Sequence, residues 1–141
     1  MENYEKELEI NQKRNEKILI EFKKWLEDKQ LSPKTINKHI SNMDLYLNDY
    51  LNYYEVTKME DGIHMAHSFL NDWFIRKCLY SSKTSIKENS ASIKKFYQCM
   101  SEKGYVSIED YKELSEMLKN CIDEFLDSLD EYENMDDEDF W

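Results

Sequence analysis

Glycine and proline are so scarce in this chain that tight turns can be only a small part of its fold. Gly62, Gly104 and Pro33 are the only such residues among 141. A sheet built from hairpins needs many of them, because its turns require backbone conformations that glycine and proline favour. The composition therefore predicts an all-α fold, and the length suits a single domain with one core.

Apolar residues recur at steps of three and four, which is the period of an α-helix packed on one side. In the second half of the first pattern, Ile18, Phe22 and Leu26 mark such a stripe. We expect a compact bundle of four to five helices. The expected helices span residues 4–29, residues from 33 to about 51, about residues 63–79, residues 85 to about 103, and residues from 107 into the acidic end.

Three polar turns mark the expected helix boundaries. Ser32 can cap the second helix through its hydroxyl, and Pro33 suits the first helical position, which has no hydrogen bond to lose. The remaining signals are a Ser85–Glu88 capping box before the fourth helix, Gly104 as its left-handed end, and a Ser107–Asp110 cap on the fifth helix.

Negative charge is concentrated at the end of the chain. The net charge is −11, but residues 123–141 contain ten acids and no base, so residues 1–122 carry −1. A near-neutral body and an acidic end obey different electrostatics, so the whole-chain charge is a poor guide to partners. We therefore expect a helical domain over residues 1–122, followed by an acidic helix end and tail over residues 123–141.

Residues 22–43 (FKKWLEDKQLSPKTINKHISNM) and residues 92–106 (SIKKFYQCMSEKGYV) follow a recognisable order of elements. The first contains an aromatic-leucine helix, a Leu-Ser-x-x-Thr turn and a second helix. The second is a helix that ends in an aromatic pair, a glutamate or lysine, and a glycine. Together, over about residues 15–106, they resemble the SAM-like core-binding domain of phage integrases and other tyrosine recombinases. The expected fifth helix is an addition without a counterpart in that family.

The resemblance implies a DNA-binding fold without its enzyme. Recombinases of that family surround the reacting phosphate with two arginines, a lysine and a His-x-x-Arg motif, because the transition state needs fixed positive charge. This chain has only Arg14 and Arg76, and none of its histidines has an arginine three residues later. We therefore expect a non-catalytic domain with no cofactor and no metal.

Basic and polar residues of the second and fourth helices are the candidates for contact with double-stranded DNA. In the family these helices lie against the duplex, where lysines can neutralise phosphates and Thr or Asn side chains can position or read. The alternative is that these lysines only solvate outer helix faces. The candidates are Lys34, Thr35, Asn37, Lys38, Lys83, Lys87, Lys94 and Lys95.

A second hypothesis is a protein-interaction or self-associating module that uses the fifth helix or the acidic end. A stripe that packs inward and a stripe that packs on a partner share the same period, so the pattern leaves both open. The acidic end alternatively serves only as a solubilising segment. The candidate partner-binding residues are Leu118, Ile122, Phe125, Phe140 and Trp141.

Histidines and cysteines give no metal signature along the sequence. His64 and His67 are three residues apart, but no carboxylate or thiol stands at ligand spacing beside them, so we expect capping or partly buried roles. Cys78, Cys99 and Cys121 form no CxxC pair and make an odd count, which favours reduced packing residues in the cytoplasm. No apolar run approaches the roughly 20 residues of a membrane span, so we expect no membrane association.

Overall fold

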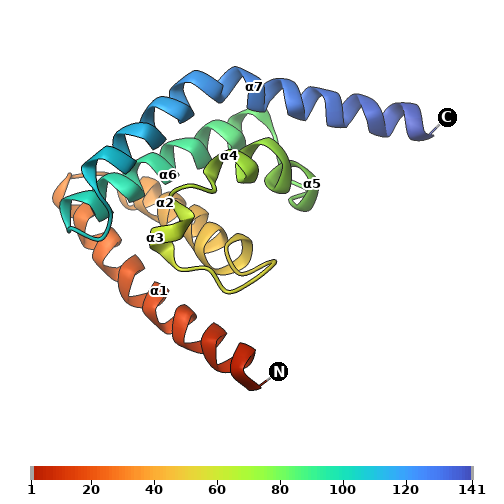
Figure 1. The fold of residues 1–141 in the computed structure, drawn as a ribbon. Helices are drawn as coiled ribbons and strands as arrows, with labels where there is room; N and C mark the ends of the chain where they lie inside the picture. The colour runs from red at the N-terminus through yellow and green to blue at the C-terminus, as the bar shows by residue number, and fades with distance from the viewer. Residues whose placement is uncertain (1, 141) are drawn as a thin grey trace.

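The computed structural model describes the backbone of residues 2–140 and the side chains of residues 3–135, and the fold is all-α over this range (Figure 1). The helix α2 continues directly into the π-helical segment η1, and α4, η2 and α5 likewise form one continuous rod. The described residues therefore build five rods and the single-turn helix α3. The elements are α1 (Glu2–Asp28), α2 (Pro33–Asp44), η1 (Leu45–Tyr50), α3 (Met59–Gly62), α4 (Ala66–Ser68), η2 (Phe69–Trp73), α5 (Phe74–Lys77), α6 (Lys83–Glu102) and α7 (Ile108–Phe140).

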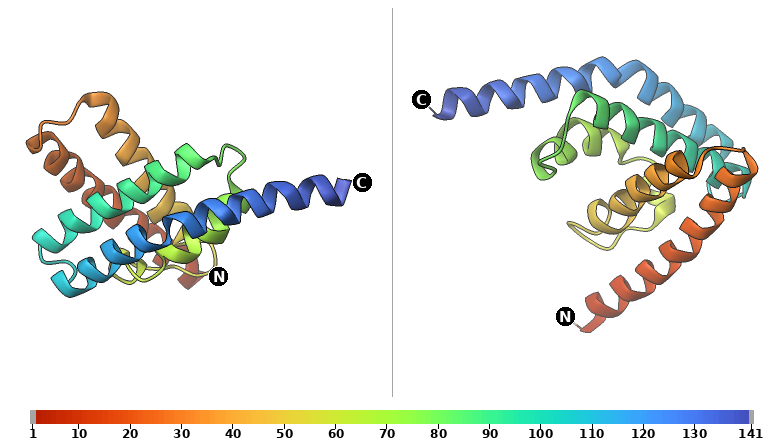
Figure 2. Two further views of the ribbon diagram at one scale, coloured as in Figure 1. Left: turned by 90° about the horizontal axis from the view of Figure 1, so that it is seen from above. Right: turned by 180° about the vertical axis from the view of Figure 1, so that it is seen from behind.

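The helix α6 is central to the arrangement. It packs against α7 on one side and α2 on the other, and α1 packs against α2 (Figure 2). The N-terminal part of α1 and the C-terminal part of α7 extend beyond the bundle at opposite ends of the chain (Figure 1). No helix in the described part of the chain is both long enough and apolar enough to cross a membrane.

Local signals set most helix ends. The backbone N–H of Thr35 donates to Ser32 Oγ at 3.2 Å, so Ser32 caps α2 as expected. The backbone N–H of Asp110 donates to Ser107 Oγ at 3.0 Å, which confirms that cap. Gly104 has a φ of 82°, the left-handed conformation in which glycine ends a helix without strain.

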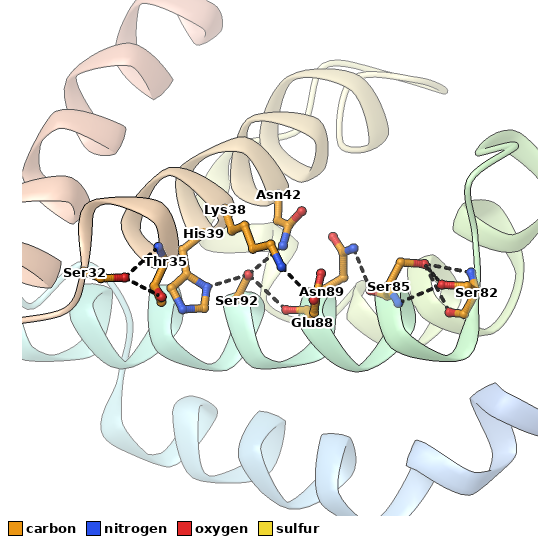
Figure 3. Close-up of polar contacts among 10 residues, drawn as sticks. All are labelled: Ser32, Thr35, Lys38, His39, Asn42, Ser82, Ser85, Glu88, Asn89 and Ser92. Atoms are coloured by element: carbon orange, nitrogen blue, oxygen red, sulfur yellow. Dashed lines mark hydrogen bonds and ion pairs between the residues drawn. The ribbon is translucent and has the colours of Figure 1, made fainter.

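The expected start of α6 was wrong by one helical turn. The N-cap is Ser82, and Ser82 and Ser85 form a reciprocal capping box (Figure 3). Ser85 therefore sits at the third helical position. Glu88, which the sequence paired with Ser85, instead contacts Lys38 of α2.

Aromatic rings from the two π-helical segments fill the middle of the core. Tyr46 meets Phe69 edge-on with centroids 5.0 Å apart, and Tyr50 meets Trp73 at 5.3 Å. All four side chains are buried, and the Tyr46 hydroxyl donates to the carbonyl of Gly62 at 2.6 Å. Ring contacts thus join the segments η1 and η2, and the Tyr46 hydroxyl bond also fixes the loop before α4.

The core continues into the acidic part of α7. Phe125 is fully buried, Leu129 is 2% exposed and Tyr132 packs against the core. The expected division at residue 122 therefore cuts through one packed helix. Beyond Tyr132 the described side chains, those of residues 133–135, are exposed.

Polar side chains attach α1 to the segment that follows α2. Asn11 donates through Nδ2 to Asn52 Oδ1 at 2.9 Å, and Asn15 donates to Asn48 Oδ1 at 2.9 Å. Arg14 forms two hydrogen bonds to Glu60, at 2.7 and 2.6 Å. Each pair spans at least 33 residues of sequence, so these bonds fix where α1 lies.

Candidate nucleic-acid interface

A buried polar seam joins α2 to α6 and sets the register of their outer faces (Figure 3). His39 Nδ1 lies 2.7 Å from Ser92 Oγ, and Asn42 donates to the same oxygen at 3.0 Å. The Ser92 hydroxyl donates its one hydrogen to the Glu88 carbonyl at 3.0 Å, so the remaining contacts are donated to it. His39 therefore carries its hydrogen on Nδ1.

The electrostatics of the seam keep His39 neutral. Burial lowers its pKa below the ordinary value of 6.5, the nearby Lys95 ammonium lowers that pKa further, and Glu88 opposes both effects. His39 is only 8% exposed, so a charged imidazole there would lose most of its hydration. The seam thus acts as a structural joint beneath the lysines.

The outer side of α2 presents the expected polar residues. Lys34, Asn37 and Lys38 are exposed, whereas the Thr35 hydroxyl accepts from Ser32 at 3.0 Å as part of the helix cap. Lys38 reaches across to α6 and pairs with Glu88 at 2.9 Å. The side chains of Lys38 and Glu88 are 54% and 40% exposed, so water weakens the pair and a phosphate can compete for Lys38.

A shallow groove between α6 and α7 brings three lysines together. Lys87 and Lys94 come from α6, and Lys119 comes from α7. Within residues 3–135, no carboxylate oxygen lies within 4.0 Å of these three amines. The remaining lining residues are small or apolar: Ser90, Ala91, Ser115, Leu118 and Ile122.

We call the combined surface the lysine face, which consists of Lys34, Lys38, Lys87, Lys94, Lys95 and Lys119. Its parts are continuous because Lys38 contacts the turn of α6 that also carries Lys87, and because Lys95 lies near His39. Sequence reasoning named all of these lysines except Lys119. It also named Lys83, whose amine lies 3.7 Å from Asp130 of α7, toward the acidic end.

The partner candidates on α7 separate into two kinds. Leu118 is 3% exposed and Phe125 is fully buried, so these two belong to the core and not to an open surface. Ile122 is partly buried and lines the groove between α6 and α7. The side chain of Phe140 and the whole of Trp141 lie outside the described residues.

The two histidines beside α4 lie against acids of α7. His64 Nε2 is 3.8 Å from Asp110 Oδ2, and His67 Nε2 is 3.3 Å from Glu124 Oε2. His67 is partly buried, as expected. His64 is exposed and Met65 occupies the N-cap position of α4, so the expectation of a capping or partly buried role is wrong for His64. The donor atoms of His67, Cys121 and Glu124 lie within 4.8 Å of one another. Sequence reasoning missed this cluster, because no local pattern connects His67 with residues 54 or more positions away.

Two of the three thiols are unreactive packing groups. Cys78 and Cys99 are buried, and burial raises the pKa of Cys78 and raises that of Cys99 to about 12. Such thiols stay protonated and react slowly. Cys121 is only partly buried and is therefore the most accessible of the three.

No protein-family model, curated protein sequence or solved structure matches this chain.

Proposed function

We propose that this chain is a non-catalytic DNA-associated domain, of the integrase core-binding type, that binds the backbone of double-stranded DNA with its lysine face. The observation that carries the proposal is the groove in which Lys87, Lys94 and Lys119 converge from two helices without a carboxylate within 4.0 Å among residues 3–135. Lysines placed along one face neutralise successive phosphates and release the counterions bound to them.

Local charge supports this proposal better than net charge does. Residues 1–122 are near neutral, but the lysine face gathers six amines, and Glu88, which lies beside it, is paired with Lys38. An approaching duplex responds to this local field, because charges beyond about 8–10 Å are screened at physiological salt. Exposed Asn37 adds a donor and acceptor beside the lysines, suited to contacts with phosphate or base edges.

The acidic end opposes such binding. It carries the four acids Asp136, Asp137, Glu138 and Asp139 beyond the last residue whose side chain is described. Like charges on this segment and on DNA repel each other, so we expect it to lower affinity. Removing residues 136–141 should therefore tighten duplex binding and should leave in place the packing that the described side chains make, of which Tyr132 is the last on the core.

A protein-interaction module is the second candidate, and one observation favours it. The helix α7 continues to Phe140, although among its described side chains, which end at Met135, the last deeply buried one is Leu129. A helix that continues past its own bundle offers a surface to a partner or to a second copy. This candidate predicts association that persists when the lysine face is neutralised.

Duplex binding at several salt concentrations tests the proposal. The logarithm of the association constant should fall linearly with the logarithm of salt concentration, at a slope of about −0.9 for each phosphate neutralised. The triple variant K87Q/K94Q/K119Q should bind more weakly and should reduce that slope by about 3, or about one for each lysine.

A matched variant separates this surface from general charge. The variant K6Q/K13Q/K17Q makes the same charge change at exposed positions of α1, away from the groove. It should keep the salt slope of the unmodified chain. Absence of duplex binding by both the full chain and the chain ending at Met135, at low salt, would exclude the proposal. Equal effects of the two triple variants would exclude the lysine face as its site.

A further inference from the structure

Three side chains that commonly bind metal ions meet where α4 packs on α7. His67 comes from α4, and Cys121 and Glu124 come from α7. One donor atom from each, an imidazole nitrogen, the thiol sulfur and a carboxylate oxygen, lies within 4.8 Å of the others. Among residues 3–135, whose side chains the structure describes, no other group of three His, Cys, Asp or Glu side chains lies this close together.

The helical spacing of α7 presents two of the donors side by side. Cys121 and Glu124 are three residues apart, so their side chains lie on the same side of the helix in successive turns. His67 faces them because its ring packs edge-on against Phe125, with centroids 5.3 Å apart. Phe125 is fully buried and therefore holds the imidazole in place, with Nε2 3.3 Å from Glu124 Oε2.

The donor set selects the kind of ion. A nitrogen, a thiolate sulfur and a carboxylate oxygen suit zinc, whereas magnesium and calcium prefer oxygen alone. Zinc bonds of about 2.0–2.3 Å place tetrahedral donors roughly 3.5 Å apart. The donor atoms now lie within 4.8 Å of one another, so zinc binding requires the Cys121 and Glu124 side chains to rotate toward His67.

We propose that His67, Cys121 and Glu124 bind one zinc ion, with water completing a tetrahedral site. The ion would join α4 to α7 across 54 residues of sequence and so fix the start of the α4–η2–α5 rod against α7. Binding replaces the thiol proton of Cys121, which passes to solvent, with the metal, so the resulting thiolate and the Glu124 carboxylate both bind the same dication. This site is separate from the lysine face, and neither proposal depends on the other.

A rival donor pair lies close by. His64 and Asp110 are 3.8 Å apart, and both line a shallow pocket that also includes His67. A metal held there would not use Cys121. The two arrangements therefore differ in whether sulfur binds the ion, which absorption spectroscopy detects directly.

Cobalt(II) and zinc(II) titrations of the reduced, tag-free full chain test the proposal. Cobalt should bind with a stoichiometry of one and give an intense near-ultraviolet band from thiolate-to-metal charge transfer, and zinc should displace it. C121S should abolish that band. H67A, C121S and E124Q should each weaken zinc binding at least tenfold, as measured by calorimetry.

Two controls keep the interpretation specific. D123N removes a carboxylate next to Glu124 but outside the cluster, and H64A removes the rival ligand. Both should bind zinc as the unmodified chain does. Loss of binding in H64A, a cobalt spectrum without the charge-transfer band, or zinc affinity unchanged by C121S would overturn the proposal.

Alkylation of the unmodified chain covers the case in which the variants fail to fold. Zinc should slow labelling of Cys121 at least tenfold, as followed by mass spectrometry, while the slow labelling of buried Cys78 and Cys99 should not change. Equal labelling of Cys121 with and without zinc would overturn the proposal without any substitution.

Discussion

His39 of α2 and Ser92 of α6 share a hydrogen bond of 2.7 Å beneath the lysine face. Lys38 is next to His39 in the chain, and Lys95 lies one helical turn after Ser92. The seam therefore sets how α2 places Lys38 relative to Lys95 of α6. The imidazole is also buried there beside Lys95, so the stability of the α2–α6 contact depends on whether that ring becomes charged.

Stability should therefore fall as pH falls through the histidine range. The folded-state pKa of His39 is lowered, so between its unfolded value of about 6.5 and the lower folded value the unfolded chain binds more protons than the native one. The contribution of His39 is complete above that window and is lost below it. Urea unfolding of the full chain and of H39N from pH 8 to pH 5.5 measures this contribution, because asparagine keeps an N–H near the Nδ1 position. Parallel curves for the two chains would contradict the expectation.

The two glycines should respond differently to alanine. A Cβ at Gly62 would lie 2.5 Å from Leu51 Cδ1 and 2.8 Å from the Tyr97 hydroxyl oxygen, so G62A should lower the free energy of unfolding by about 1–3 kcal/mol through overpacking. Gly104 has open space but a φ of 82°, so G104A should cost about 1–2 kcal/mol through backbone strain alone. Urea unfolding measures both. G104N should recover part of the loss because asparagine tolerates that conformation, whereas G62S should not recover any.

The Arg14–Glu60 pair should contribute more than the exposed pairs of this chain. Its two hydrogen bonds are 2.7 and 2.6 Å, and its side chains are 34% and 35% exposed. The hydrogen bond from Arg14 lowers the pKa of Glu60, so its contribution is present at neutral pH and is lost as the carboxylate protonates below its ordinary 4.5. A double-mutant cycle with R14Q and E60Q should give a coupling of about 1 kcal/mol that falls with salt. The same cycle on Lys13 and Glu9, which are 72% and 66% exposed, should give close to zero.

A chain that ends at Met135 should still fold, whereas a chain that ends at Ile122 should not. A chain ending at Met135 keeps Phe125, Leu129 and Tyr132, whereas a chain ending at Ile122 loses all three from the core. F125A alone should cost about 3–5 kcal/mol, since it empties a fully buried site. Thermal unfolding followed by circular dichroism should show a cooperative transition for the longer chain and none for the shorter. A cooperative transition in the shorter chain would show that α7 is dispensable to the core.

Helix class and most helix ends could be predicted because their signals are local. Ser32, Gly104 and Ser107 each act within four residues of the backbone groups that they satisfy. The start of α6 was misplaced because Ser82 and Ser85 are both competent caps, and Glu88, three residues after Ser85, favoured the second serine although it pairs with Lys38 of α2 in the structure. Local rules could not choose between two serines one turn apart.

The candidate lysines could be named from patterns that lie within single helices. Lys87 and Lys94 stand seven residues apart, two turns of one helix, and both line the groove between α6 and α7. Lys119 and the cluster of His67, Cys121 and Glu124 depend on how α7 packs against α6 and α4, which no spacing along the sequence encodes. The acidic composition of residues 123–135 also concealed their packing, because four apolar side chains, those of Phe125, Leu126, Leu129 and Tyr132, suffice to keep that part of α7 on the core.

The π-helical segments η1 and η2 make two stretches of this chain sensitive to length rather than to residue type. The N–H of Leu51 bonds to the carbonyl of Tyr46, five residues back, so each such turn holds one residue more than an α-helical turn. Deleting one residue from Leu45–Tyr50 would let α-helical bonding close, but it would rotate everything that follows by about 100° relative to Tyr46. Tyr50 would then lose its place opposite Phe69 and Trp73. Among related chains, single-residue insertions and deletions should therefore be rare in these two stretches, even where the aromatic residues themselves are exchanged for one another.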